Sequence, residues 1–130
     1  MKTRMLLLGA LLLSSAAMGM GPTCAEFTAM GNPVTGTMEQ VAFSKPTTRQ
    51  WGVYQPAIAR HVGDVAMFSL SSRARALKRI EKTPTLGFGW LLRETMSMTR
   101  TFCYLHPERD MEDVAFEQVD YMIDAVAAKM

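Results

Sequence analysis

The sequence predicts an all-α protein, a small single-domain orthogonal helical bundle stapled by one disulfide. Three observations favour this fold class. Apolar side chains recur at three- and four-residue spacing, few β-branched runs alternate as strands require, and the 130-residue chain has two cysteines. We expect a signal peptide over residues 1–19 and one helical domain over residues 20–130, without internal repeats.

The N-terminus has the pattern of a secretory leader. Lys2 and Arg4 form a positively charged start, and the leucine-rich run from Met5 to Ala17 carries no charge. The alternative is an uncleaved membrane anchor, but a spanning helix needs about 20 apolar residues, and Gly19 and the residues after it interrupt the run. The sequence therefore predicts an exported domain with no membrane span after leader removal.

Two short helices are expected next. Thr23 with Glu26 forms a capping box, so a helix begins there and carries Cys24 in its first turn until the Gly-Asn-Pro sequence at 31–33 stops it. Thr37 is the expected cap of a second helix, which ends before the Lys-Pro pair at 45–46. Its apolar residues are Met38, Val41, Ala42 and Phe43.

The middle of the chain predicts three further helices. Pro56 suits the first position of a helix that ends near Phe68, after the apolar group Trp51, Val53 and Tyr54. A serine at position 71 or 72 begins the next helix, in which apolar and basic faces oppose each other. The Thr-Pro pair at 83–84 is the expected start of a long helix that ends near Cys103.

The last helix has the clearest pattern. Asp110 is its expected cap, and Asp113 lies at the third position. Its apolar residues recur at helical spacing, which predicts one buried face. They are Phe116, Val119, Ile123 and Val126.

Cys24 and Cys103 are expected to form one structural disulfide. An exported chain with two cysteines favours this pairing, and neither a CxxC motif nor a zinc-ligand spacing is present. The bond would enclose nearly the whole domain, and in the chain-entropy model a loop of this length stabilises the native state by about 4–5 kcal/mol.

Charge is balanced overall but unevenly distributed. Removal of Lys2 and Arg4 with the leader leaves 12 basic and 12 acidic residues, so no general attraction to nucleic acid or anionic membranes is expected. Residues 45–100 contain ten basic and three acidic side chains, whereas residues 107–130 contain seven acidic and two basic ones. We expect solvated helix faces whose opposite charges meet in the fold.

Catalytic and metal chemistry find little support. Met96, Met98, His106 and Met111 invite a copper-carrier interpretation, but helix positions two apart point to different sides, and methionine is more often a core residue. No hydrolase motif, phosphate-binding loop or paired-carboxylate arrangement is present. We therefore expect no enzyme activity, no cofactor, no metal and no nucleic-acid partner.

Two short motifs resemble one family. The opening Thr23-Cys24-Ala25-Glu26-Phe27 is similar to the Thr-Cys-x-x-Phe opening of the HdeA-like periplasmic acid-stress chaperones, in which a second cysteine pairs with the first. The Cys103–Glu108 segment, followed by an amphipathic helix, resembles the Cys-x-x-x-Pro ending of relatives in that family. The chain departs from the chaperone in its longer segment between the cysteines and in its acidic final helix.

The resemblance implies a periplasmic holdase. Such proteins are folded, often dimeric and inactive near neutral pH, and in acid they loosen and hold unfolding periplasmic proteins. Protonation of 12 carboxylates and two histidines would take the mature chain to about +14, and this self-repulsion disfavours the compact state. The alternative is a folded, disulfide-stapled protein of the same family that binds an envelope protein without chaperone activity.

The residues expected to contact clients or a second copy are apolar. In the opened state they would come from the first half of the domain and from the last helix. They are Phe27, Val41, Phe43, Trp51, Val53, Tyr54, Phe116, Val119, Ile123 and Val126.

Overall fold

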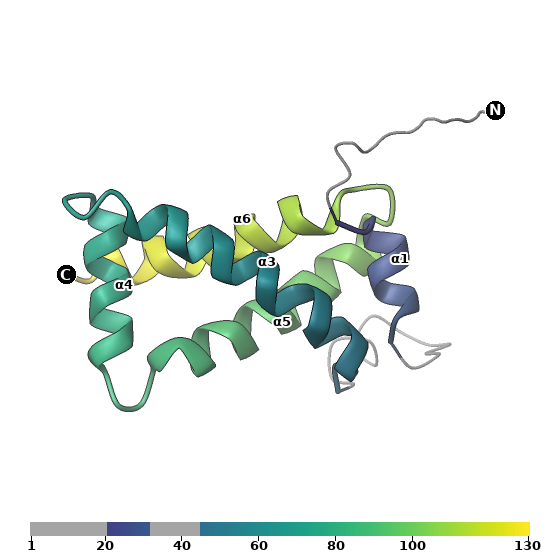
Figure 1. Cartoon of the computed structure of the whole chain (residues 1–130), viewed down its shortest axis with the longest axis horizontal. Helices are drawn as coiled ribbons and strands as arrows, with labels where there is room; N and C mark the ends of the chain where they lie inside the picture. The colour runs from purple at the N-terminus through teal and green to yellow at the C-terminus, as the bar shows by residue number, and fades with distance from the viewer. Residues whose placement is uncertain (1–20, 32–44) are drawn as a thin grey trace.

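The computed structural model describes residues 21–31 and 45–130. These residues form five helices and no strand, which confirms the all-α, single-domain prediction (Figure 1). The helix expected to carry Val41 and Phe43 lies outside the described residues. The helices are α1 (Cys24–Ala29), α3 (Thr48–Ala66), α4 (Ser72–Lys82), α5 (Gly87–Leu105) and α6 (Met111–Ala128).

Three predicted helix starts are confirmed by their caps. The Thr23 hydroxyl accepts from the Glu26 amide at 3.1 Å, while the Glu26 carboxylate accepts from the Thr23 amide at 2.8 Å. The Ser71 hydroxyl caps α4, and the Asp110 carboxylate caps α6. Each side chain satisfies an amide that has no partner within its own helix.

The prediction for the start of α3 is wrong. The helix begins at Thr48, and Pro56 lies inside it rather than at its first position. Thr47 and Gln50 form a second capping box, with distances of 3.2 and 3.1 Å. The box fixes an earlier start, and the ring of Pro56 removes one amide donor from the middle of the helix.

The predicted start of α5 is also wrong. Thr83 ends α4 instead, because it precedes Pro84 and its backbone is extended. Its hydroxyl donates to the Arg79 carbonyl at 2.7 Å. The next helix begins at Gly87, whose φ of 70° is a left-handed conformation that glycine adopts without steric cost. Leu86, at the cap position, supplies no side-chain hydrogen bond.

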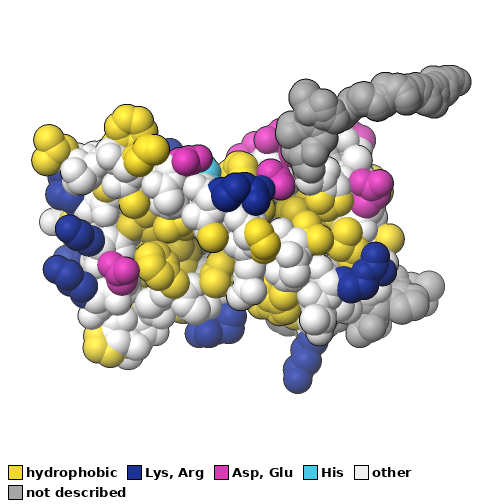
Figure 2. All heavy atoms as spheres, in the orientation of Figure 1, with side chains coloured by type: hydrophobic (Ala, Val, Ile, Leu, Met, Phe, Trp, Pro, Cys, Tyr) yellow, Lys and Arg dark blue, Asp and Glu magenta, His cyan; other side chains and the backbone are white. Residues whose placement is uncertain are grey.

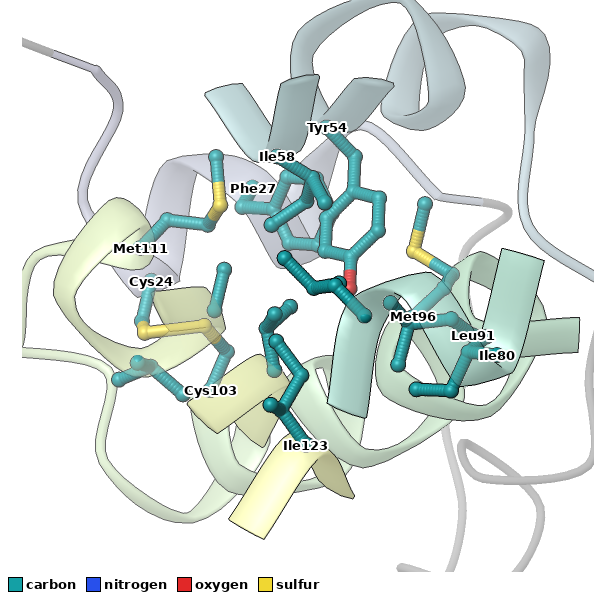
Figure 3. Packing of buried hydrophobic residues seen from close by; sticks show 14 of the residues in the cluster. Cys24, Phe27, Tyr54, Ile58, Ile80, Leu91, Met96, Cys103, Met111 and Ile123 are labelled. Atoms are coloured by element: carbon teal, nitrogen blue, oxygen red, sulfur yellow. A yellow bond between two sulfur atoms is a disulfide. The ribbon is translucent and has the colours of Figure 1, made fainter. Parts of the chain in front are cut away.

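The helices enclose one apolar core. The α5 and α6 helices make the most extensive contact, and α4 crosses the end of α6 (Figure 1). Side chains from every described helix meet in this core (Figure 3). The largest fully buried apolar ones are Phe27, Tyr54, Ile58, Ile80, Leu91, Met96, Met111 and Ile123.

The predicted disulfide is present. Cys24 and Cys103 are bonded, their Cα atoms lie 4.6 Å apart, and both residues are fully buried. Three backbone hydrogen bonds connect the start of the domain to the turn before α6. The amides of Cys24, Ala25 and Met111 donate to the carbonyls of Arg109, Pro107 and Pro22 at 2.7, 3.0 and 3.0 Å.

None of the described helices is long and apolar enough to cross a membrane.

Candidate functional site

An apolar groove lies between α3 and α5, and we call it the α3–α5 groove. Its volume is about 490 Å³, within the roughly 300–1,000 Å³ range of ligand pockets. Hydrophobic side chains are gathered left of the centre of Figure 2, below α3. The lining residues are Gln55, Ile58, Ala59, Val62, Gly63, Ala66, Phe88, Leu91 and Leu92.

The groove arises from small residues on one face of α3. Ala59, Gly63 and Ala66 recur at helical spacing and leave space that a larger side chain would fill. Ile58 and Leu91 are each 1 % exposed and form the floor. Helices α3 and α5 make few direct contacts, so the space between them stays open.

The groove continues toward α4. A second hollow of about 200 Å³ shares Val62, Ala66 and Phe88 with it and is also lined by Leu77 of α4. Lys78 and Glu81 stand at this end. At the opposite end, Trp51, Gln55, Gly89, Leu92 and Arg93 line a third hollow of about 340 Å³. Apolar surface with charged ends therefore extends along α5.

The opposite charges of the chain meet, as the sequence predicts. The Arg73 guanidinium lies 2.8 Å from Asp124 and 3.5 Å from Asp120, which joins α4 to α6. Arg60 of α3 lies 3.1 Å from Glu112 of α6. Because these carboxylates lie on α6, the pairs connect that helix to α3 and α4.

His61 is part of the same seam between α3 and α6. Its Nε2 lies 2.8 Å from Asp120 Oδ1, and its ring stacks on Phe116 with a centroid distance of 4.4 Å and an interplanar angle of 6°. The structure places it at the rim, with partners on α6.

The expected client-binding residues lie at different depths. Phe27, Tyr54, Val119 and Ile123 are core residues that are fully buried in the folded protein. The remaining described residues, Trp51, Val53, Phe116 and Val126, pack against the core and are partly exposed. Val41 and Phe43 lie outside the described residues.

Tyr54 connects the N-terminal half of α3 to α5. Its hydroxyl forms a hydrogen bond with the Thr95 hydroxyl, which in turn donates to the Leu91 carbonyl at 2.7 Å. Burial raises the pKa of Tyr54 to about 12, although the nearby threonine hydroxyls oppose this shift. The phenol therefore stays neutral and serves as a packing and hydrogen-bonding group.

Sequence reasoning missed several surface residues. Val62, Phe88 and Leu92 line the groove, and none of them was named as a candidate from the sequence. The helix expected to end near Phe68 ends at Ala66, and the Phe68 side chain is 72 % exposed. The signal that could have indicated the groove is the set of small residues Ala59, Gly63 and Ala66 on one face of α3. Small side chains can leave a gap between helices as readily as they allow close packing.

In residues 21–31 and 45–130, no group of three or more His, Cys, Asp or Glu side chains is placed to bind an ion. No protein-family model matches the chain, and neither the curated proteins nor the solved structures compared with it contain a match.

Proposed function

We propose that this protein is an exported periplasmic holdase that loosens in acid and binds apolar segments of unfolding proteins. The disulfide would keep one end of the opened molecule connected. The client would bind in the α3–α5 groove and on the apolar, core-facing side of α6. The predicted leader, the family-like motifs and the distribution of charge around α6 support this proposal.

One observation carries the acid response. Every ion pair among the described residues takes its carboxylate from α6, through Glu112, Glu117, Asp120 or Asp124. Protonation of the carboxylates of α6 would therefore remove all of these attractions together. Exposed pairs contribute only about 0.2–1 kcal/mol each, so their combined loss and the added positive charge would act together.

The pKa shifts give this response its direction. Hydrogen bonding to Arg73 lowers the pKa of Asp124, and hydrogen bonding to Arg109 lowers that of Glu117. A carboxyl whose pKa is lower in the folded state stabilises the fold above its ordinary pKa, and this stabilisation is lost as the pH falls through the folded value. Both groups therefore favour unfolding in acid.

The pKa of Asp110 is shifted in the opposite direction. Burial, assisted by Asp113 and Glu112, raises its pKa, although the Asp113 amide opposes this shift. Protonation of Asp110 therefore favours the folded state as the pH falls. This group lies beside the disulfide, so the acid response should be weaker there than at the far end of α6.

The proposal is tested by light scattering of a client that aggregates in acid. We expect the oxidised, exported protein to suppress aggregation at about pH 3 and to do so weakly at neutral pH. Leu92→Lys, in the groove, should weaken protection, whereas the matched control Tyr121→Lys, on an exposed part of α6, should not. No protection by the parent at about pH 3 would overturn the proposal.

A second candidate is a folded envelope interaction protein without chaperone activity. The observation that favours it is the groove itself, which is open in the compact structure. Such a protein should retain its near-UV circular dichroism at about pH 3, and its binding should depend on Leu92 at neutral pH. Loss of that signal, with protection of the client, favours the holdase instead.

A further inference from the structure

The turn between α3 and α4 carries the most exposed apolar side chains in the described part of the chain. We call residues 67–70 the α3–α4 tip. Met67 and Phe68 are each 72 % exposed, and Leu70 is 88 % exposed. Side chains of this size are stabilised by leaving water, so a cluster of them at one apex marks a contact surface.

The tip has a defined conformation. The Ser71 amide donates to the Phe68 carbonyl at 2.8 Å, and the Met67 amide donates to the Gly63 carbonyl at 3.1 Å. The Arg75 guanidinium donates to the Leu70 carbonyl at 2.5 Å and so ties the tip to the first turns of α4. The apolar side chains are therefore presented outward by backbone contacts that need no partner.

A row of cations begins beside the tip. Arg75, Lys78, Arg79 and Lys82 follow helical spacing on the face of α4 opposite its buried residues, and all four are exposed. Within the described residues none of the four forms an ion pair with a carboxylate, and Glu81 is the only acidic residue of α4. We call these four residues the α4 basic stripe.

The tip and the stripe lie at the same end of the molecule. Hydrophobic side chains project at the upper left of Figure 2, and Lys and Arg side chains lie along the left edge below them. The acidic side chains in this view lie mostly on the other side of the molecule. Although the predicted mature chain has a net charge near zero, this end has a local excess of positive charge.

We propose that the tip and the α4 basic stripe form a docking site for an anionic phospholipid surface. The apolar side chains would enter the boundary between headgroups and acyl chains, while the cations contact the phosphates. An acidic protein would match the cations, but it would leave three large apolar side chains in water unless it also offered a pocket. A lipid surface accommodates both features at once.

The site is tested by flotation of the exported protein with vesicles, after mass spectrometry has fixed its N-terminus. Vesicles of phosphatidylglycerol and phosphatidylcholine are compared with phosphatidylcholine alone. The parent should bind the anionic vesicles and dissociate as salt is added. Phe68→Ser with Leu70→Ser should lower the partition coefficient at least about tenfold, since two exposed apolar side chains are lost.

Charge and control variants complete the test. Lys78→Gln with Lys82→Gln should weaken binding to anionic vesicles by about fivefold for each charge and leave binding to neutral vesicles unchanged. Leu105→Ser with Tyr121→Ser removes comparable exposed apolar side chains elsewhere and should have no effect. Equal losses in the tip and control variants would overturn the proposal, as would failure of the parent to bind. Self-association that requires Phe68, without vesicle binding, would also overturn it by assigning the tip to a second copy.

Discussion

The two ends of the molecule are stabilised in different ways. At the stapled end, α1 is held by the Cys24–Cys103 bond and by backbone hydrogen bonds to the turn before α6. At the groove end, where α3 passes into α4, the helices are joined by side chains, with Arg73 pairing to α6 and an open hollow beside Phe88. The disulfide and the backbone hydrogen bonds of the stapled end are insensitive to moderate acid, although the Arg60–Glu112 and Arg109–Glu117 pairs lie toward that end as well. The groove end has side-chain contacts alone, and among them the Arg73–Asp124 pair depends on a carboxylate.

This difference indicates which end should open first. Covalent and backbone connections survive the protonation of carboxylates, but the attraction between Arg73 and Asp124 does not. Apolar burial of Leu77 and Ile80 still holds α4 against the core. We therefore expect partial opening in acid at the groove end rather than complete unfolding.

The largest effect should come from removal of the disulfide. Cys24→Ser with Cys103→Ser should lower the free energy of unfolding by about 4–5 kcal/mol, because the bond closes a long loop in the unfolded chain. Urea unfolding followed by circular dichroism measures this change, with the reduced parent as its control. A loss below about 1 kcal/mol would show that the two ends do not differ in the way described.

Two phenylalanines compare the ends directly. Phe27→Ala, in the core of the stapled end, should cost about 3–4 kcal/mol through lost burial and a cavity. Phe88→Ala, at a groove residue that is 38 % exposed, should cost about 1 kcal/mol or less. Equal costs in urea unfolding would contradict the unequal packing of the two ends.

The cap of α6 tests a polar contact at the stapled end. Asp110→Ala should cost about 1 kcal/mol at neutral pH because the Asp113 amide loses its acceptor. Asp110→Asn retains an acceptor and removes a carboxylate whose pKa burial raises, so its stability should match or exceed that of the parent. Equal destabilisation by both variants would show that the charge, rather than the cap, is required.

The smallest effect should come from the ion pair at the groove end. Asp124→Asn should cost about 0.5 kcal/mol at neutral pH and less at about pH 3, because Arg73 lowers the pKa of Asp124 in the folded protein and this stabilisation is lost as the carboxylate is protonated. Unfolding curves at both pH values measure the difference. Glu81→Gln, for which the described residues provide no ion pair, is the control, and a pH-independent cost of Asp124→Asn would contradict the assignment.

Local signals in the sequence predicted much of the fold. Thr23, Ser71 and Asp110 cap their helices because each side chain satisfies amides only three residues away. Pro56 misled the prediction of α3, since a proline tolerated inside a helix has the same sequence signal as one at its start. Secondary-structure signals in a sequence act over a few residues, so they predict helix caps more accurately than helix length.

Sequence patterns did not predict the α3–α5 groove or the α3–α4 tip. The periodicity of Ile58 and Val62 predicts that their face of α3 avoids water, but not how closely α5 approaches it. Phe68 continues the same apolar spacing, yet the helix ends two residues before it and the side chain faces solvent. Both features depend on the angle between helices, which long-range packing decides.

Hydrogen exchange resolved along the chain tests the central claim most directly. The oxidised protein is labelled at neutral pH and at about pH 3, and the rates are corrected for the intrinsic rate at each pH. We expect α4 and the C-terminal half of α3 to lose protection in acid, while α1 and the start of α6 remain protected. Uniform loss along the chain, or earlier loss around Cys24, would contradict the account.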